Sequence, residues 1–129
     1  MNIYTVYLNN GNSLVLVAGN FVWRMVDMQY QFIFAKKGVE FENPDDLQAE
    51  QKDNDVYLRF TDVIAIVPQD KHGGKGFSIA FKDGRSLHVA ATSFKRISAD
   101  RINFYEGEER IKNLYLDTST ISAIYPQEI

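Results

Sequence analysis

Short runs in which apolar and polar residues alternate recur along this chain, and turn residues separate the runs. Alternation with a period of two is typical of half-buried β strands, because successive side chains of a strand point to opposite faces. Asn10-Gly11 and Asp83-Gly84 each lie between two such runs. Both dipeptides favour the tight type I′ turn, in which the two central residues take positive φ. The pattern therefore predicts a hairpin with strands at 3–8 and 13–18 and another with strands at 76–81 and 86–91.

Each half of the chain continues with three further predicted strands. The third strand lies at 30–35 or 101–105, the fourth surrounds Tyr57 or Tyr115, and the fifth covers 64–67 or 122–125. Pro68 and Pro126 are expected to end the fifth strands, because proline has no amide hydrogen to donate to a sheet. Each half is thus predicted to be a five-strand meander. The residues expected to face its core from the second strand are Leu14, Leu16 and Ala18, and correspondingly Leu87, Val89 and Ala91.

The two halves also match residue by residue. Residues 5–21 align without a gap on 78–94, at an offset of 73, and five positions are identical. Residues 56–69 align on 114–127, at an offset of 58, and six positions are identical. The difference between the offsets places about fifteen extra residues in the first half, most of them in the acidic segment 42–54, which is typical of a solvated loop or a short surface helix. Matched turns and strands in matched order predict an internal duplication.

The repeat sets the predicted domain boundaries. Residues 1–69 form the first β repeat, with the acidic insertion at 42–54, and residues 76–129 form the second. Residues 70–75 are the linker, and Gly73-Gly74 is its flexible point. We therefore expect an all-β fold of two tandem, five-stranded, barrel-like repeats packed as one compact unit.

The order of these elements resembles a known family. A strand, an Asn-Gly or Asp-Gly hairpin, a Phe-containing third strand and a last strand such as Ile121-Ser-Ala-Ile-Tyr-Pro126 are similar to the Sm-like (SH3-like) small β-barrel, particularly its Hfq branch. The resemblance covers nearly the whole chain twice and implies assembly into rings. Hfq-like proteins contact RNA through a Lys-His pair before the last strand, whereas the aligned residues here are Arg59-Phe60-Thr61 and Asp117-Thr118-Ser119. The resemblance therefore implies the fold and not the RNA site.

Composition narrows the protein class. The 129 residues are 45% hydrophobic and 24% charged, which is typical of a globular chain. Because cysteine is absent, disulfides, a thiolate nucleophile and cysteine-bound metals are excluded. No run approaches the roughly 18 apolar residues that span a bilayer, and residues 1–4 lack the form of a signal peptide. We expect a cytoplasmic protein that makes no membrane contact.

Charge is distributed unevenly. The net charge is −3, but residues 71–101 carry seven basic and two acidic residues, a local balance of +5 against −8 for the rest. This basic segment is either a solvated face, a contact between repeats or subunits, or a site for an anion or nucleic acid. The residues predicted for such a site are Lys82, Arg85, Lys95, Arg96 and Arg101.

Catalytic patterns are weak. His72 and His88 have no partner at a metal-ligand spacing, so neither a metal site nor a cofactor is predicted. Asp45-Asp46 and the acidic residues at 106–109 lie in predicted turns, and the glycine-rich segment 71–76 lacks the form of a phosphate-binding loop. The aromatic residues that either stack on bases or fill the core are Tyr4, Tyr7, Trp23, Tyr30 and Phe32, and alternating strand positions favour the core. We therefore expect no enzymatic activity.

Three function classes remain open. The leading prediction is a non-catalytic binding module that acts as an oligomer through contacts with a protein partner, with itself or with a small ligand. The second is RNA or DNA binding through residues 71–101, and residues 62–96 also resemble the LytTR DNA-binding domain, although that domain is not a tandem duplication. The third is a small inhibitor or accessory protein of a phage or mobile element, which only the chain's size and lack of catalytic patterns indicate.

Overall fold

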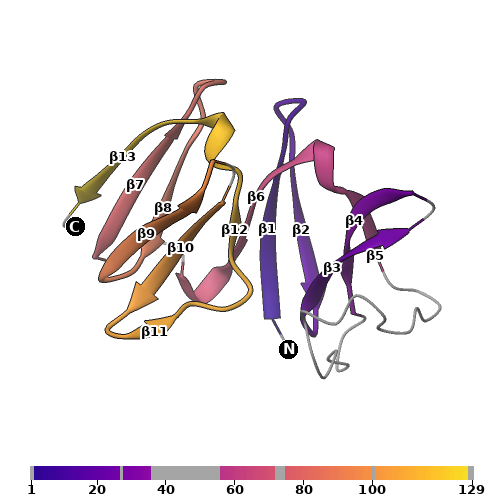
Figure 1. The fold of residues 1–129 in the computed structure, drawn as a ribbon, viewed down its shortest axis with the longest axis horizontal. Helices are drawn as coiled ribbons and strands as arrows, with labels where there is room; N and C mark the ends of the chain where they lie inside the picture. The colour runs from indigo at the N-terminus through magenta and orange to yellow at the C-terminus, as the bar shows by residue number, and fades with distance from the viewer. Residues whose placement is uncertain (1, 27, 36–55, 72–74, 100, 128–129) are drawn as a thin grey trace.

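A computed structural model describes most of the chain (Figure 1). The described residues are 2–26, 28–35, 56–71, 75–99 and 101–127. They form thirteen β strands and three short 3-10 helices and contain no α-helix, so the predicted all-β class is confirmed. The acidic insertion 42–54, His72 and Gly73-Gly74 lie outside the described residues.

The described residues of the first half form six strands and two 3-10 helices. They are β1 (Asn2–Leu8), β2 (Ser13–Ala18), β3 (Phe21–Val26), β4 (Gln29–Phe34), β5 (Val56–Arg59), η1 (Phe60–Asp62), β6 (Val63–Pro68) and η2 (Gln69–Lys71). The described residues of the second half form seven strands and one 3-10 helix. They are β7 (Gly76–Phe81), β8 (Ser86–Ala90), β9 (Ser93–Ser98), β10 (Arg101–Glu106), β11 (Glu109–Arg110), β12 (Tyr115–Leu116), η3 (Thr118–Thr120) and β13 (Ile121–Gln127).

Both predicted hairpins form, but their turns differ from the type I′ prediction. Gly11 and Gly84 have positive φ, at 91° and 94°, whereas Asn10 and Asp83 do not. Their side chains instead accept a hydrogen bond from the backbone two residues on, at 3.0 Å from Asn12 and 2.9 Å from Arg85. Each loop has three residues and ends with a left-handed glycine, the other common hairpin solution.

The prediction of a five-strand meander is wrong in two respects. It missed β3 and β9, which pair with β4 and β10. The β3–β4 turn includes Met28 at a φ of 67°, a left-handed conformation that glycine or asparagine usually takes, so Met28 gives no turn signal in the sequence. The order is also not that of a meander, because β6 returns to pair with β1 and β13 returns to pair with β7. Pro126 does not end β13, since a strand at the edge of a sheet tolerates proline.

Strand pairing divides the described residues into four sheets. Their strand orders are β12-β6-β1-β2, β11-β10-β9, β13-β7-β8 and β3-β4-β5. None of these sheets closes on itself among the residues that the structure describes, so a closed barrel is not observed. Strand β6 runs through the middle of the molecule between β1 and β12, and through β12 it joins the second half of the chain to the first (Figure 1).

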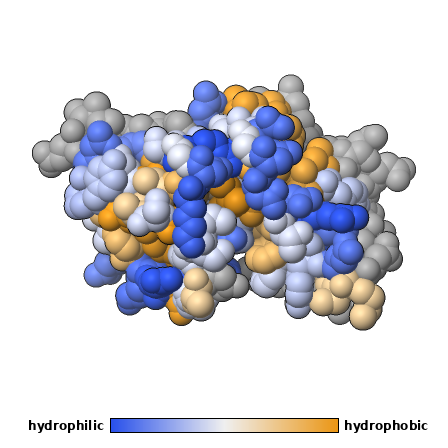
Figure 2. All heavy atoms as spheres, turned by 90° about the horizontal axis from the view of Figure 1, so that it is seen from above, coloured by the Kyte–Doolittle hydropathy of each residue, from blue (hydrophilic) through white to orange (hydrophobic). Residues whose placement is uncertain are grey.

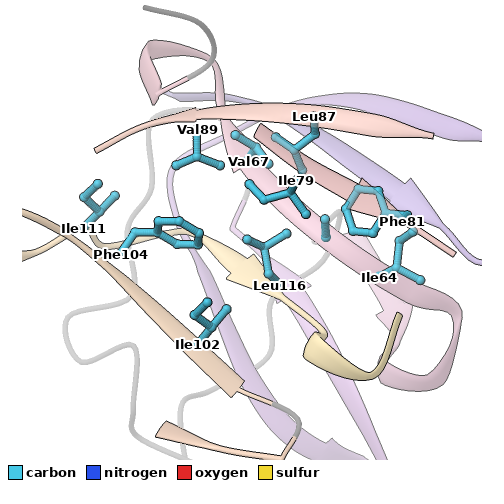
Figure 3. Close-up of a cluster of buried hydrophobic side chains, with 11 residues drawn as sticks. Ile64, Val67, Ile79, Phe81, Leu87, Val89, Ile102, Phe104, Ile111 and Leu116 are labelled. Atoms are coloured by element: carbon cyan, nitrogen blue, oxygen red, sulfur yellow. The ribbon is translucent and has the colours of Figure 1, made fainter. Parts of the chain in front are cut away.

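Two apolar clusters form the core, and β6 contributes to both. One gathers residues of β6, β7, β8, β10 and β12 around Ile79, Val89 and Phe104 (Figure 3). The other packs β1 and β4 against β6 and contains Tyr4 and Phe32, so these two predicted core aromatics are confirmed. Leu87 and Val89 are buried as predicted, whereas Leu14 is 36% exposed and lies outside both apolar clusters.

Candidate functional site

Arg85, one of the five basic residues predicted to bind an anion, connects the two hairpin turns. Its Nη1 donates to the backbone oxygen of Asn12 at 2.8 Å, and its Nη2 donates to the backbone oxygen of Leu8. Asp83 accepts from Nε at 2.8 Å and from Nη2 at 2.6 Å. A planar guanidinium has donors in fixed directions, which lets one side chain bind a carboxylate and two carbonyl oxygens. Figure 2 shows the molecule from above the view of Figure 1, and strongly hydrophilic side chains gather near the middle of the face seen there.

The charge of Arg85 changes the titration of its neighbours. Its side-chain hydrogen bonds and, after them, a backbone hydrogen bond from its amide hold the pKa of the Asp83 carboxyl below its ordinary value. The guanidinium carbon also lies 5.7 Å from the centre of the Tyr7 ring. Burial raises the pKa of the Tyr7 hydroxyl, and the positive charge of Arg85 opposes part of this rise. Arg85, Asp83 and Tyr7 therefore form an electrostatic contact within the chain.

We expect Arg85→Ala to lower the free energy of unfolding by about 1–3 kcal/mol, the usual cost of losing hydrogen bonds that involve a charged group. The side chain of Arg85 is 21% exposed, so water replaces its donors only in part. Urea denaturation at neutral pH measures the change. Lys82→Ala is the matched control, because Lys82 lies in the same turn and is exposed.

Wild type and Arg85→Ala should also differ in how their stability depends on pH. A carboxyl whose pKa is lowered by folding adds stability above its ordinary pKa, and that stability is lost as the pH falls through the lowered value. The stability difference between wild type and Arg85→Ala should therefore shrink in acid. NMR titration should show the pKa of Asp83 rising in Arg85→Ala, and an unchanged Asp83 titration would contradict the assigned contact.

The other predicted anion-binding residues do not join Arg85 in one site. Arg101 places its guanidinium carbon 5.8 Å from the centre of the Trp23 ring, which is a second contact between the two halves of the chain. Lys82, Lys95 and Arg96 are exposed. Lys95 and Arg96 are consecutive in β9, so their side chains point to opposite faces of the strand. The five residues thus lie on the β7–β8 turn, on β9 and at the start of β10, and anion binding there stays a prediction.

Of the weak catalytic candidates, Glu106 forms an ion pair and His88 lies half-buried on a strand. Glu106 accepts from Lys71 Nζ at 3.0 and 3.1 Å, which ties η2 to β10. His88 is half-buried on β8, in register with Ser78. No group of three His, Asp or Glu side chains suited to a metal ion occurs among the described residues.

A groove that the sequence did not predict lies beside β13. It has a volume of about 260 Å³. Its walls are Phe94 and Arg96 of β9, Ile102 of β10, Thr118 of η3, and Ile121, Ser122, Ala123 and Ile124 of β13. These segments come together only in the folded chain, so no local pattern marks the groove. The one signal in the sequence is the mixture of small and apolar residues in 121–124, which is also typical of an ordinary buried strand.

Strand β13 borders this groove with an accessible edge. In the described residues β13 pairs with β7 alone, and it is the outer strand of its sheet. Ser122, Ala123 and Tyr125 are exposed. An outer strand presents a row of backbone N–H and C=O groups that accept a further strand. The β13 edge and the adjacent groove together form the candidate functional site.

Within the chain's described ranges, no helix has the length and apolar character needed to cross a membrane. No family model, no curated protein and no solved structure matches this chain.

Proposed function

We propose that this protein is a non-catalytic interaction module, built from two copies of one β unit, that binds an extended protein segment along β13. The observation that carries the proposal is the groove of about 260 Å³ beside an outer strand. A bound segment adds a strand through main-chain hydrogen bonds, and a pocket for an alternate side chain adds selectivity. The walls of the groove combine mainly apolar side chains with two hydroxyl side chains, Thr118 and Ser122, and one charged side chain, Arg96; an aromatic or aliphatic side chain suits this lining.

Matching strand pairs support the tandem repeat. Strands β1 and β2 pair as β7 and β8 do, and β6 returns to β1 as β13 returns to β7. Strands β3 and β4 pair as β9 and β10 do. Helix η1 spans 60–62 and η3 spans 118–120, an offset of 58 that equals the offset of the sequence alignment. Both halves therefore carry a one-turn helix directly before the last strand.

The contacts of the basic residues favour protein binding over nucleic-acid binding. Arg85 binds Asp83 and two backbone oxygens, and Arg101 lies over Trp23. Side chains engaged within the chain neutralise fewer phosphates, and neutralised phosphates supply most of the affinity for nucleic acid.

Selection from a library of displayed heptapeptides tests the proposal. Wild type should enrich peptides with an aromatic or large aliphatic residue near the centre, because that side chain fills the groove. Ala123→Arg should lose these peptides, since Ala123 lines the groove and is exposed. Val15→Lys, a change at an exposed position of the outer strand β2, should retain them. Peptides that bind wild type and Ala123→Arg equally would contradict the assigned site.

A further inference from the structure

We infer that the segment bound along β13 is β5 of a second copy of this chain, so that copies associate head to tail. This inference rests on the proposed repeat and on the proposed site beside β13. It starts from a strand pair that already exists within the chain. Strand β12 of the second half pairs antiparallel with β6 of the first, with Tyr115 opposite Ile66 and Leu116 opposite Ala65.

The sequence offset identifies the strands that correspond to this pair. At an offset of 58, Tyr57-Leu58 of β5 corresponds to Tyr115-Leu116 of β12, with both residues identical. Ala65-Ile66 of β6 corresponds in the same way to Ala123-Ile124 of β13, again with both identical. The four residues that form the internal junction are therefore all present a second time.

The described residues of one chain do not join the second set. Among the described residues, β5 pairs with β4 alone and β13 with β7 alone. The position of β5 also matches that of β12, because Gln31 pairs with Arg59 as Arg101 pairs with Asp117. Applied between two copies, the internal register places Tyr57 opposite Ile124 and Leu58 opposite Ala123.

The corresponding strands differ in burial as the head-to-tail arrangement requires. All six residues of β6 are buried, whereas most of β13 is exposed and Tyr125 is 50% exposed. Leu116 is buried and Tyr115 half-buried, whereas Leu58 is half-buried and Tyr57 is 38% exposed. Each of the four residue types is thus more exposed at the two outer strands than at the internal junction.

The groove in the second half lies at the position that corresponds to the site of the Tyr115 ring in the first half. The Tyr115 ring packs on Phe32, with ring centres 4.7 Å apart, and on Phe60, with ring centres 5.7 Å apart. Phe32 pairs with Trp23 as Ile102 pairs with Arg96, so Ile102 is the counterpart of Phe32. Thr118 is the counterpart of Phe60 at the offset of 58. Ile102 and Thr118 both line the groove, which therefore occupies the place that the Tyr57 ring of the next copy would fill.

This interface uses two different surfaces of the chain. Each copy offers β5 at one end and accepts a strand on β13 at the other. Such a heterologous contact repeats until it closes into a ring or extends as a helical filament. An arrangement of this kind also covers two outer strands that would otherwise template aggregation.

Two single substitutions separate the two surfaces. Tyr57→Lys removes the ring and brings a cation toward Arg96, so it blocks the β5 surface and leaves β13 intact. Ala123→Arg fills the groove, so it blocks the β13 surface and leaves β5 intact. Both positions are exposed, and circular dichroism with thermal unfolding verifies that the variants fold. Val15→Lys is the matched control, because it introduces the same charge at an exposed position of a different outer strand.

Native mass spectrometry and sedimentation velocity over a range of concentrations provide the readout. Wild type and Val15→Lys should form assemblies larger than a monomer, whereas Tyr57→Lys and Ala123→Arg should each be monomeric. An equimolar mixture of the two monomeric variants should form a one-to-one dimer and nothing larger, because only one intact junction can form. A dimer in which β13 pairs with β13, or β5 with β5, does not give this complementation.

Three outcomes overturn the inference. They are a monomeric wild type, assemblies that survive either substitution, and a variant mixture that stays monomeric. If wild type is monomeric but library peptides bind it and not Ala123→Arg, the proposed function holds and only the identity of the bound segment is wrong. If neither peptides nor a second copy bind at β13, both fail.

Discussion

Leu116→Ala should lower the free energy of unfolding by about 2–5 kcal/mol, the range for removing a buried leucine side chain. Leu116 is 1% exposed and lies in the middle of its apolar cluster, with Ile79 on one side and Ile102 on the other (Figure 3). Its strand also pairs with β6, so the cavity would open where the two halves of the chain meet. Urea denaturation followed by tryptophan fluorescence measures the loss.

Leu58→Ala is the matched control for this substitution, because Leu58 occupies the corresponding position of β5 and is only half-buried. It should be measured in the Ala123→Arg chain, which we expect to be monomeric, so that no second copy covers β5. The loss should then be clearly smaller than for Leu116→Ala. Equal losses at the two positions would contradict the burial difference between β5 and β12.

Gly76→Ala should lower the free energy of unfolding by about 1–3 kcal/mol or more, the cost of forcing atoms into a packed site. Gly76 begins β7 and lies opposite Ala90 of β8. A Cβ there would lie 2.0 Å from the backbone oxygen of Val89 and 2.9 Å from the Cα of Ala90. Both atoms belong to the backbone, so relief requires β7 and β8 to separate. Thermal unfolding followed by circular dichroism measures the effect.

Gly107→Asn serves as the control for the glycine substitution. Gly107 has a φ of 63°, and a Cβ added there would meet no atom within 4 Å. Asparagine tolerates this left-handed conformation, so the free energy of unfolding should change by only about a few tenths of a kcal/mol. If Gly76→Ala were as mild as Gly107→Asn, the close approach of β7 to β8 would be wrong.

Much of the local structure was predictable. Both hairpins, the final strands β6 and β13, and the strands around Tyr57 and Tyr115 appear where alternation and turn residues placed them. The reason is that a period of two and an Asn-Gly or Asp-Gly turn act over only a few residues. The type I′ geometry was wrong because Asx side chains offered the backbone a competing hydrogen bond.

The candidate site was not predictable to the same extent. Charge along the sequence singled out Arg85 and Arg101 but left open a solvated face, a contact between repeats or subunits, and an anion site. In the structure Arg85 bonds backbone oxygens 73 and 77 residues away. The groove likewise gathers residues of β9, β10, η3 and β13. Charge and alternation carry no information on which distant segment a side chain meets.

The sequence by itself determined the all-β class, the hairpin positions and the correspondence between residues 56–69 and 114–127, because each depends on side-chain period, turn chemistry or identity along the chain. Only the tertiary structure decided that β6 lies between β1 and β12 while β13 stays at the edge of its sheet. Two strands with the same Ala-Ile pair thereby differ in burial and in the contacts open to them. The physical reason is that the pairing of a strand depends on what the rest of the chain brings to its edge.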